Sequence, residues 1–225
     1  MKSPLPLAAL LSGALLALSP AARGVALAQL DDFQDGTVKN WANGGPAADP
    51  LNITTGGPLG LSDNYLQITA DGSGSGGKLT SYNRSQWLGN YNAAGVTAIA
   101  MDLKGFSSPG SAALSIRFAL KTGTGSTPGY VSTAAFSLPI DGLWHHAVFS
   151  LSAMTAVGSP GTLASVLSNP GEARILHAAA ADTVHGDNIV GQFGVDNIQA
   201  LPEPTAGGLC AAGLGAFLLR RRARR

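Results

Sequence analysis

Apolar and polar residues alternate through much of this chain. In NYLQITA (residues 64–70) and AALSIRFAL (residues 112–120), almost every second residue is a larger apolar one. Neighbouring side chains of a strand point to opposite faces, so this period of two predicts strands with one buried face. Five further segments are predicted as strands, namely GVTAIAMDLKG (95–105), GYVSTAAFSLP (129–139), GLWHHAVFSL (142–151), ARILHA (173–178) and QFGVDNIQA (192–200).

The segments between these strands favour an all-β fold. They are rich in Gly, Pro, Ser and Asn, which predicts turns. One short helix is predicted at residues 162–167, and no longer helical period interrupts the strands. Many short strands joined by turns are typical of two-layer β proteins. We therefore expect a two-sheet β-sandwich with a jelly-roll-like topology, followed by a separate C-terminal apolar helix.

The first 28 residues have the three parts of a secretory signal peptide. Lys2 precedes an apolar run at residues 5–18, and Ala26-Leu27-Ala28 places small residues where a signal peptidase cleaves. A membrane-spanning helix would need about 20 apolar residues, and Pro6 and Pro20 fit such a helix badly. We predict export, with cleavage after Ala28.

The last 24 residues also fall into three parts. Pro202, Glu203 and Pro204 precede an uncharged stretch at residues 205–219, and the chain then ends in the arginines Arg220, Arg221, Arg222, Arg224 and Arg225. As a helix, the uncharged stretch spans roughly 22 Å, which is less than a hydrocarbon core of about 30 Å. Long arginine side chains extend the effective span, so this tail is predicted to anchor the chain transiently in the inner membrane.

Two other interpretations of the tail compete with a membrane anchor. An Arg-rich tail could bind nucleic acid, but an exported chain meets little of it. The uncharged stretch could be an ordinary buried helix, but its four glycines make it a poor helix former in water.

This ending, behind a signal peptide, resembles the PEP-CTERM sorting signal of Gram-negative bacteria. The resemblance covers residues 202–225 and rests on the order of the three parts. It implies recognition by an exosortase-type membrane protease, removal of the tail as in a GPI signal, and delivery to the cell surface or extracellular matrix. We expect a signal peptide at 1–28, a β-sandwich ectodomain at 29–201 and a sorting signal at 202–225.

The charge of the ectodomain differs from that of the whole chain. Seven of the 14 basic residues lie outside residues 29–204, which leaves 7 against 13 acidic ones and a net charge of −6. An acidic domain disfavours phosphate backbones, so we expect no nucleic acid as a partner. The single cysteine, Cys210, lies in the tail, so no disulfide can stabilise the ectodomain.

The glycine-rich segment DGSGSGGKLT (residues 71–80) carries the spacing G-x-G-x-x-G and part of a P-loop. Nucleotide binding would need a helix after the glycines and a Ser or Thr after Lys78. Leu79 occupies that position, and the following residues lack a helical pattern. We expect a flexible hairpin loop here.

The sequence offers little for catalysis. His145 and His146 are adjacent, so on a strand they would point to opposite faces and could not readily share a metal ion. A glycosidase needs two convergent carboxylates, but Glu172 and Glu203 are the only glutamates between residues 29 and 204. The motifs H-E-x-x-H, G-x-S-x-G and paired C-x-x-C are absent from the sequence. We expect a protein that is not an enzyme.

The segments LDDFQDGTVKNW (30–41) and GVDNIQAL (194–201) resemble the first and last strands of jelly-roll carbohydrate-binding and galactose-binding-like modules. The resemblance implies that these strands lie side by side and that a structural Ca²⁺ ion bridges them. Carried over to this chain, it places calcium at Asp32, Asp35 and Asp196. Carboxylates and carbonyls supply the oxygens that calcium prefers, although acidic residues at strand ends are also common as solvated turn residues.

Sugar binding by such a module would need an aromatic platform with polar neighbours. The candidates are Trp41, Trp87, Tyr91, Tyr130 and Trp144. We expect Trp144 to be buried, because it starts an alternating strand. Trp87 and Tyr91 lie in the polar segment NRSQWLGNY and are predicted to form an exposed ligand-binding pair.

Three hypotheses for function follow from these patterns. The first is an exported, exosortase-processed surface protein whose sandwich binds exopolysaccharide. The second is a structural matrix protein that contacts other proteins, and the third is a polysaccharide hydrolase on the same fold. Fold class alone does not choose among them.

Overall fold

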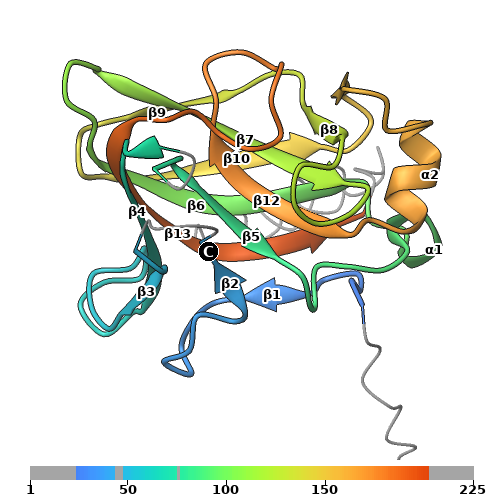
Figure 1. The fold of residues 1–225 in the computed structure, drawn as a ribbon. Coiled ribbons are helices and arrows are strands. Elements are labelled where there is room, and N and C mark those ends of the chain that lie inside the picture. Colours follow the sequence, from blue (N-terminus) through green and yellow to red (C-terminus); the bar gives the residue numbers. More distant parts are fainter. Residues whose placement is uncertain (1–23, 44–47, 75–76, 203–225) are drawn as a thin grey trace, which may run out of the picture.

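The computed structural model describes residues 24–43, 48–74 and 77–202, which form two antiparallel sheets packed face to face (Figure 1). Sheet A has the strand order β10-β6-β13-β4-β3, with β1 paired to β13, and sheet B has the order β11-β8-β7-β12-β5-β2, with β9 paired to β7. Sheet A comprises β1 (Leu30–Asp31), β3 (Leu51–Ile53), β4 (Tyr65–Asp71), β6 (Ala98–Ser107), β10 (Trp144–Ser150) and β13 (Val190–Leu201). Sheet B comprises β2 (Trp41–Ala42), β5 (Thr80–Asn83), β7 (Ala113–Lys121), β8 (Gly129–Ser132), β9 (Phe136–Pro139), β11 (Met154–Val157) and β12 (Glu172–His177). The helices are α1 (Tyr91–Ala94) and α2 (Leu163–Ser168).

The expected all-β sandwich is confirmed, and each long alternating segment forms a strand. The predicted helix at 162–167 corresponds to α2. The segment at 129–139 forms two strands, β8 and β9, because residues 133–135 leave the ladder between them. Periodicity alone did not predict the very short strands β1 and β2, because two residues are too few to show a period of two.

The core lies between the sheets and is built from the apolar half of each alternating strand. Ile99, Met101 and Leu103 of β6 face Ile116 and Phe118 of β7 across the sandwich, and all five side chains are fully buried. Because the alternation continues along each strand, the residues between them point away from the core. This alternation decides which side chains each sheet presents on its outer face.

The start and end of the described chain are joined at β1 and β13. Leu30 pairs with Gln199 and Asp31 with Ile198, so the two segments lie side by side as expected. The carboxylate of Asp31 accepts hydrogen bonds from the indole nitrogens of Trp41 at 2.9 Å and Trp87 at 2.7 Å. Burial raises the pKa of Asp31, and these bonds partly offset that rise. This pairing ties β1 to the tryptophan cluster beneath it.

The glycine-rich segment joins the two sheets. It connects β4 of sheet A to β5 of sheet B, so the expected hairpin was wrong. A hairpin would have kept both strands in one sheet, whereas Gly72 and Gly74, both with positive φ, let the chain turn away. A strand follows Lys78, which removes the helix that a phosphate-binding loop requires.

The ends of the chain are described only in part. Residues 1–23 of the predicted signal peptide and residues 203–225 of the predicted sorting signal and apolar helix lie outside the described residues. Val25 is buried, and its N–H donates to the carbonyl of Leu88 at 2.5 Å, so part of the segment that cleavage after Ala28 would remove packs on the sandwich. Within residues 24–202 as described, helices are too short to cross a bilayer.

Candidate functional site

One buried carboxylate organises the outer face of sheet B. Glu172 and Arg174 of β12 point away from the core because Ala173 and Ile175 between them point into it. Glu172 pairs with Lys121 of β7, and Arg174 pairs with Tyr82 of β5. We call this surface the basic face, defined by Tyr82, Arg84, Arg117, Lys121, Glu172 and Arg174.

Three cations converge on Glu172, whose side chain is fully buried. The Nε atom of Arg84 lies 2.6 Å from one carboxylate oxygen, and Nζ of Lys121 lies 3.2 Å from the other. The Nε atom of Arg174 donates to that second oxygen as well. Lys121 also donates to the carbonyl of Gly125, in the loop that follows β7. A buried charge needs such partners, because moving an unpaired charge out of water costs several kcal/mol, on the order of 5.

Tyr82 lies between the two arginines of this cluster. The guanidinium of Arg84 is 4.1 Å from the centre of the Tyr82 ring, and that of Arg174 is 5.8 Å from it. A guanidinium over an aromatic face gains electrostatic attraction and loses freedom of movement. The ring therefore holds Arg84 in one orientation, while 40% of the arginine side chain stays exposed.

Positive charge dominates the surroundings of this carboxylate. Burial would raise the pKa of Glu172, but Arg174, Arg84 and Lys121 together lower it, so the group stays ionised. Burial, assisted by the charge of Arg174, lowers the pKa of Lys121. Burial and then the charges of Arg174, Lys121 and Lys78 lower the pKa of His185 to about 4, so this ring is neutral at pH 7.

A loop at residues 178–188 covers the other end of the basic face. Arg117 of β7 is 5% exposed and donates to the carbonyls of Ala178 at 2.9 Å and Ala179 at 3.2 Å, within that loop. It also donates to the carbonyls of Ser132 and Thr133, both at 2.8 Å. Arg117 thus fixes the loop against the end of β8, beside the group of charges around Glu172.

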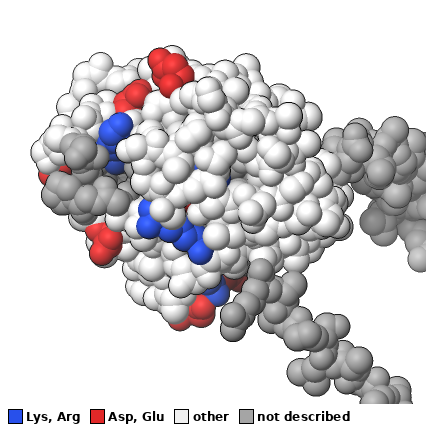
Figure 2. Space-filling view, turned by 45° about the vertical axis from the view of Figure 1, so that its right-hand side comes forward, with Lys and Arg blue, Asp and Glu red and all other residues white. Residues whose placement is uncertain are grey.

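A separate pocket of about 500 Å³ is lined by none of the residues that define the basic face. His177 lines this pocket, and its Nδ1 accepts the N–H of Ser115 at 2.9 Å. Figure 2 shows lysine and arginine atoms gathered near the middle of one face of the molecule, while most visible acidic atoms lie toward its margins.

The predicted ligand-binding pair, Trp87 and Tyr91, was wrong. Both side chains are fully buried. The Trp87 indole donates to Asp31, and the Tyr91 hydroxyl donates to the carbonyl of Trp87 at 2.7 Å. The polar residues around them misled the prediction, because Trp87 is buried by contacts with Asp31 of β1 and Trp41 of β2, which lie far from it in the sequence.

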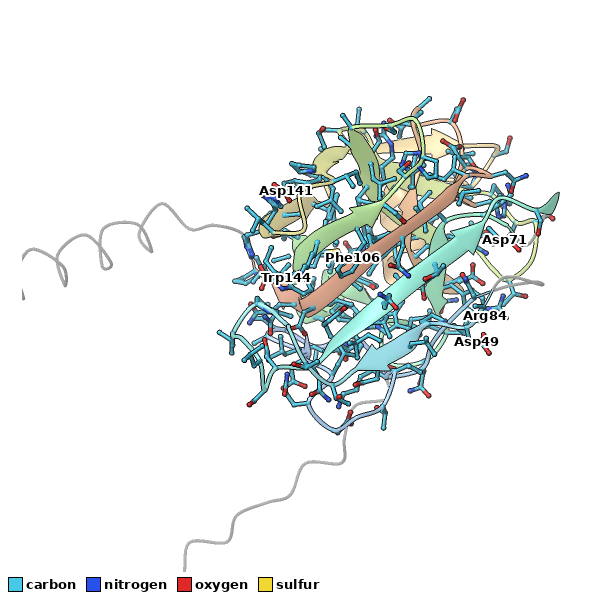
Figure 3. All side chains as sticks on the ribbon, turned by 90° about the vertical axis from the view of Figure 1, so that its left-hand side faces the viewer. Asp49, Asp71, Arg84, Phe106, Asp141 and Trp144 are labelled. Atoms are coloured by element: carbon cyan, nitrogen blue, oxygen red, sulfur yellow. The ribbon has the colours of Figure 1, made fainter. Side chains whose placement is uncertain are left out.

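Trp144 was also misplaced, since it is partly exposed on the outer face of sheet A. Its neighbours His145 and Ala147 take the inward positions of β10. The Trp144 ring lies edge-on to Tyr65 with centroids 5.3 Å apart, and its Nε1 donates to the carbonyl of Gly56 at 3.0 Å. Figure 3 shows Trp144 close to Phe106, while Arg84 lies toward the opposite edge of the molecule.

The two adjacent histidines lie on different faces, as expected for a strand. His145 is 3.0 Å from a carboxylate oxygen of Asp141, and His146 is 2.8 Å from Asp102. They therefore do not form a shared metal site.

The three predicted calcium ligands are only partly brought together. Asp196 is fully buried at a bulge in β13, and its Oδ2 has no hydrogen-bond partner. Burial, with added repulsion from Asp63, Asp102 and Asp32, raises the pKa of Asp196 to about 8. A cation at this point would relieve that repulsion.

Asp35 does not fit such a site. It is about half exposed and binds Lys39, with Oδ2 2.5 Å from Nζ, and Thr37, with Oδ1 2.9 Å from the hydroxyl. These partners lower its pKa to about 2. Among the residues that the structure describes, no three His, Cys, Asp or Glu side chains form a ready-made metal cluster.

Comparison with known proteins identifies structural neighbours but no close relative. No protein-family model matches the chain, and no curated protein is similar to it in sequence. One structural neighbour is a family 11 carbohydrate-binding module from Clostridium thermocellum in complex with a beta-1,3-1,4-mixed-linked tetrasaccharide. The sequence identity is 22% and the TM-score is 0.47, and the match covers 78% of this chain and 95% of that module. A non-crystalline cellulose-specific module of family 28 matches at 12% identity, 80% of this chain, 98% of that chain and a TM-score of 0.48.

A third neighbour is an exo-beta-agarase, at 14% identity and a TM-score of 0.53. The match covers 79% of this chain and 25% of the agarase chain. This likeness shows the sandwich fold alone, and the basic face must be interpreted from its own chemistry.

We expect Glu172→Gln to lower the free energy of unfolding by about 3 kcal/mol at pH 7, since it leaves three buried or partly buried cations without their carboxylate. Because the pKa of Glu172 is lowered in the fold, its stabilisation is present above the unfolded pKa of about 4.3 and is lost as the pH falls through the folded value. Urea unfolding at pH 7 and pH 3 should show that the variant loses less stability on acidification than the wild type does. Asp49→Asn removes the same charge at an exposed position, and an equal effect there would contradict this role for Glu172.

Proposed function

We propose that this protein is an exported surface or matrix protein whose basic face binds polysaccharide. The observation that supports this best is the fixed arrangement of Arg84 and Arg174 around Tyr82, on the outer face of a sheet. A polysaccharide presents many hydroxyl and ring oxygens, and rigid N–H donors can bind these without a further loss of side-chain freedom. An outer sheet face also suits an extended polymer, which needs a long surface.

Binding without catalysis accounts better for Glu172 than hydrolysis does. A general acid in a glycosidase carries a raised pKa, so that it is protonated near neutral pH. Three cations lower the pKa of Glu172 instead, and its side chain is fully buried. We therefore propose a binding protein, and turnover of a labelled polysaccharide would restore the hydrolase hypothesis.

The second candidate is a structural matrix protein that contacts other proteins. Leu59 and Leu61, in the loop between β3 and β4, are 86% and 85% exposed. Exposed leucines of this kind suit a protein contact. Self-association that depends on protein concentration, without retention on glycan, would favour this candidate.

Calcium is proposed as a structural ion at Asp196, with Asp32 as a second carboxylate. The proposal is supported by the buried Oδ2 of Asp196, which has no partner among the described residues, and by the carboxylates around it. In that position the ion would supply the positive charge that the bulge in β13 lacks.

Addition of excess calcium should raise the melting temperature of the full-length protein in mild detergent relative to EDTA. A rise of about 5 to 10 °C is expected at about 100 times the dissociation constant. Asp196→Asn should abolish the rise, because it removes the negative charge from the proposed ligand. Asp35→Asn is the matched control and should keep it, since Asp35 is already paired with Lys39. No shift in the wild type would rule the ion out.

The route to the surface is proposed from the two ends of the chain. The signal peptide directs export, an exosortase-type protease removes the tail, and the protein then occupies the cell surface or extracellular matrix of a Gram-negative bacterium. Mass spectrometry of surface protein from the native host should find Gln29 at the N-terminus and no residue beyond Pro204. An intact arginine tail on surface material would contradict processing.

Retention on the host's exopolysaccharide tests the binding function. In affinity electrophoresis of the full-length protein, Tyr82→Ala should weaken retardation about fivefold or more, because it removes the ring that orients Arg84. Phe106→Ala removes an aromatic ring from the outer face of sheet A and should leave retardation unchanged. If Phe106→Ala weakens retardation and Tyr82→Ala does not, the binding site lies on sheet A. If the wild type is not retarded at all, the structural matrix candidate is favoured.

A further inference from the structure

Positive charge is concentrated on the basic face of a domain that is acidic overall. Four of the seven basic residues between residues 29 and 204 belong to this face, where the carboxylate of Glu172 is surrounded by three of them. The remaining acidic neighbours, Asp182 and Asp187, act on Arg117 at the other end, beside the loop at 178–188. The end near Tyr82 therefore has a local surplus of positive charge, although residues 29–204 together carry a net charge of −6.

Arg84 has unused hydrogen-bond donors at the Tyr82 end of the basic face. Its Nε is bonded to Glu172 and its guanidinium lies on the Tyr82 ring, so its orientation is fixed. Among the described residues, its two terminal nitrogens make no hydrogen bond, although the side chain is 40% exposed. Arg174 is also bonded to Glu172, but its side chain is only 9% exposed and its Nη1 lies 3.5 Å from the carbonyl of His185, so the accessible donors are those of Arg84.

The chemistry of these free donors favours a carboxylate ligand. The two terminal nitrogens of a guanidinium form a planar fork that matches the two oxygens of a carboxylate, and the charge assistance strengthens both bonds. The fork is already oriented, so little entropy is lost on binding. The lowered pKa of the nearby His185 supports the presence of surplus positive charge around the fork.

We propose that the basic face recognises the carboxylate groups of an acidic polysaccharide, such as one containing uronic acids, with Arg84 as the main contact and Arg174 beside it. This inference rests on the proposed polysaccharide binding and narrows it to one class of glycan. A nucleic acid also carries anions, but with the proposed export this chain would meet little of it.

A matched pair of polymers tests this specificity. Polygalacturonate and the same polymer with its carboxylates reduced to alcohols share a backbone and differ only in charge. The full-length protein should bind the acidic form about tenfold more tightly, which corresponds to one charge-assisted contact, and raised salt should narrow the difference. The host exopolysaccharide, before and after the same reduction, serves as the second pair.

Arg84→Gln should remove most of this preference, while its exposure allows the fold to persist. Lys104→Gln removes the same charge beside Phe106 and Trp144 on sheet A, and it should leave the preference intact. Equal binding of both polymer forms by the wild type would overturn the carboxylate inference and leave polysaccharide binding standing. Binding of neither form of the host exopolysaccharide would overturn both, and equally tight binding of single-stranded DNA would replace carboxylate recognition with general attraction to polyanions.

Discussion

The cost of burying a carboxylate shapes this sandwich more than any other single constraint. An ionised group that leaves water must find hydrogen bonds or opposite charge, or it becomes neutral. Asp31 is compensated by two tryptophan indoles and Glu172 by three cations, whereas Asp196 accepts one backbone N–H at Oδ1 and its Oδ2 has no partner among the described residues. These three solutions correspond to three roles: Asp31 joins β1 to the core, Glu172 orders the basic face, and Asp196 carries the proposed ion.

The outer faces of the two sheets carry different side chains, because alternation gives each sheet one face toward the core and one away from it. Sheet A joins the chain's first and last described strands and carries the aromatic group of Tyr65, Phe106 and Trp144. Sheet B holds its polar side chains in place through Glu172 and through the carbonyl contacts of Arg117. Side chains that are already fixed by the protein suit ligand binding, since they have little freedom left to lose. The buried ion network thus serves as the support for the more exposed Arg84.

Charge distribution links the fold to the proposed surroundings of the protein. Most acidic residues are spread over the surface, while four of the seven cations between residues 29 and 204 belong to the basic face. A positive cluster within an acidic surface attracts carboxylates at that one place. The same arrangement would make the proposed binding sensitive to salt, because part of Arg84 remains exposed to water.

The sequence by itself determined the all-β class, the long strands and α2, because period-two alternation is a local property of each strand. It also placed the first and last strands side by side, through resemblance to a known module. Only the tertiary structure decided which aromatic rings are buried, because Trp87 and Tyr91 are covered by segments distant in the sequence. The same holds for the basic face: Lys121 and Glu172 lie on β7 and β12, Arg84 directly follows β5, and their convergence depends on strand register, which no local pattern encodes.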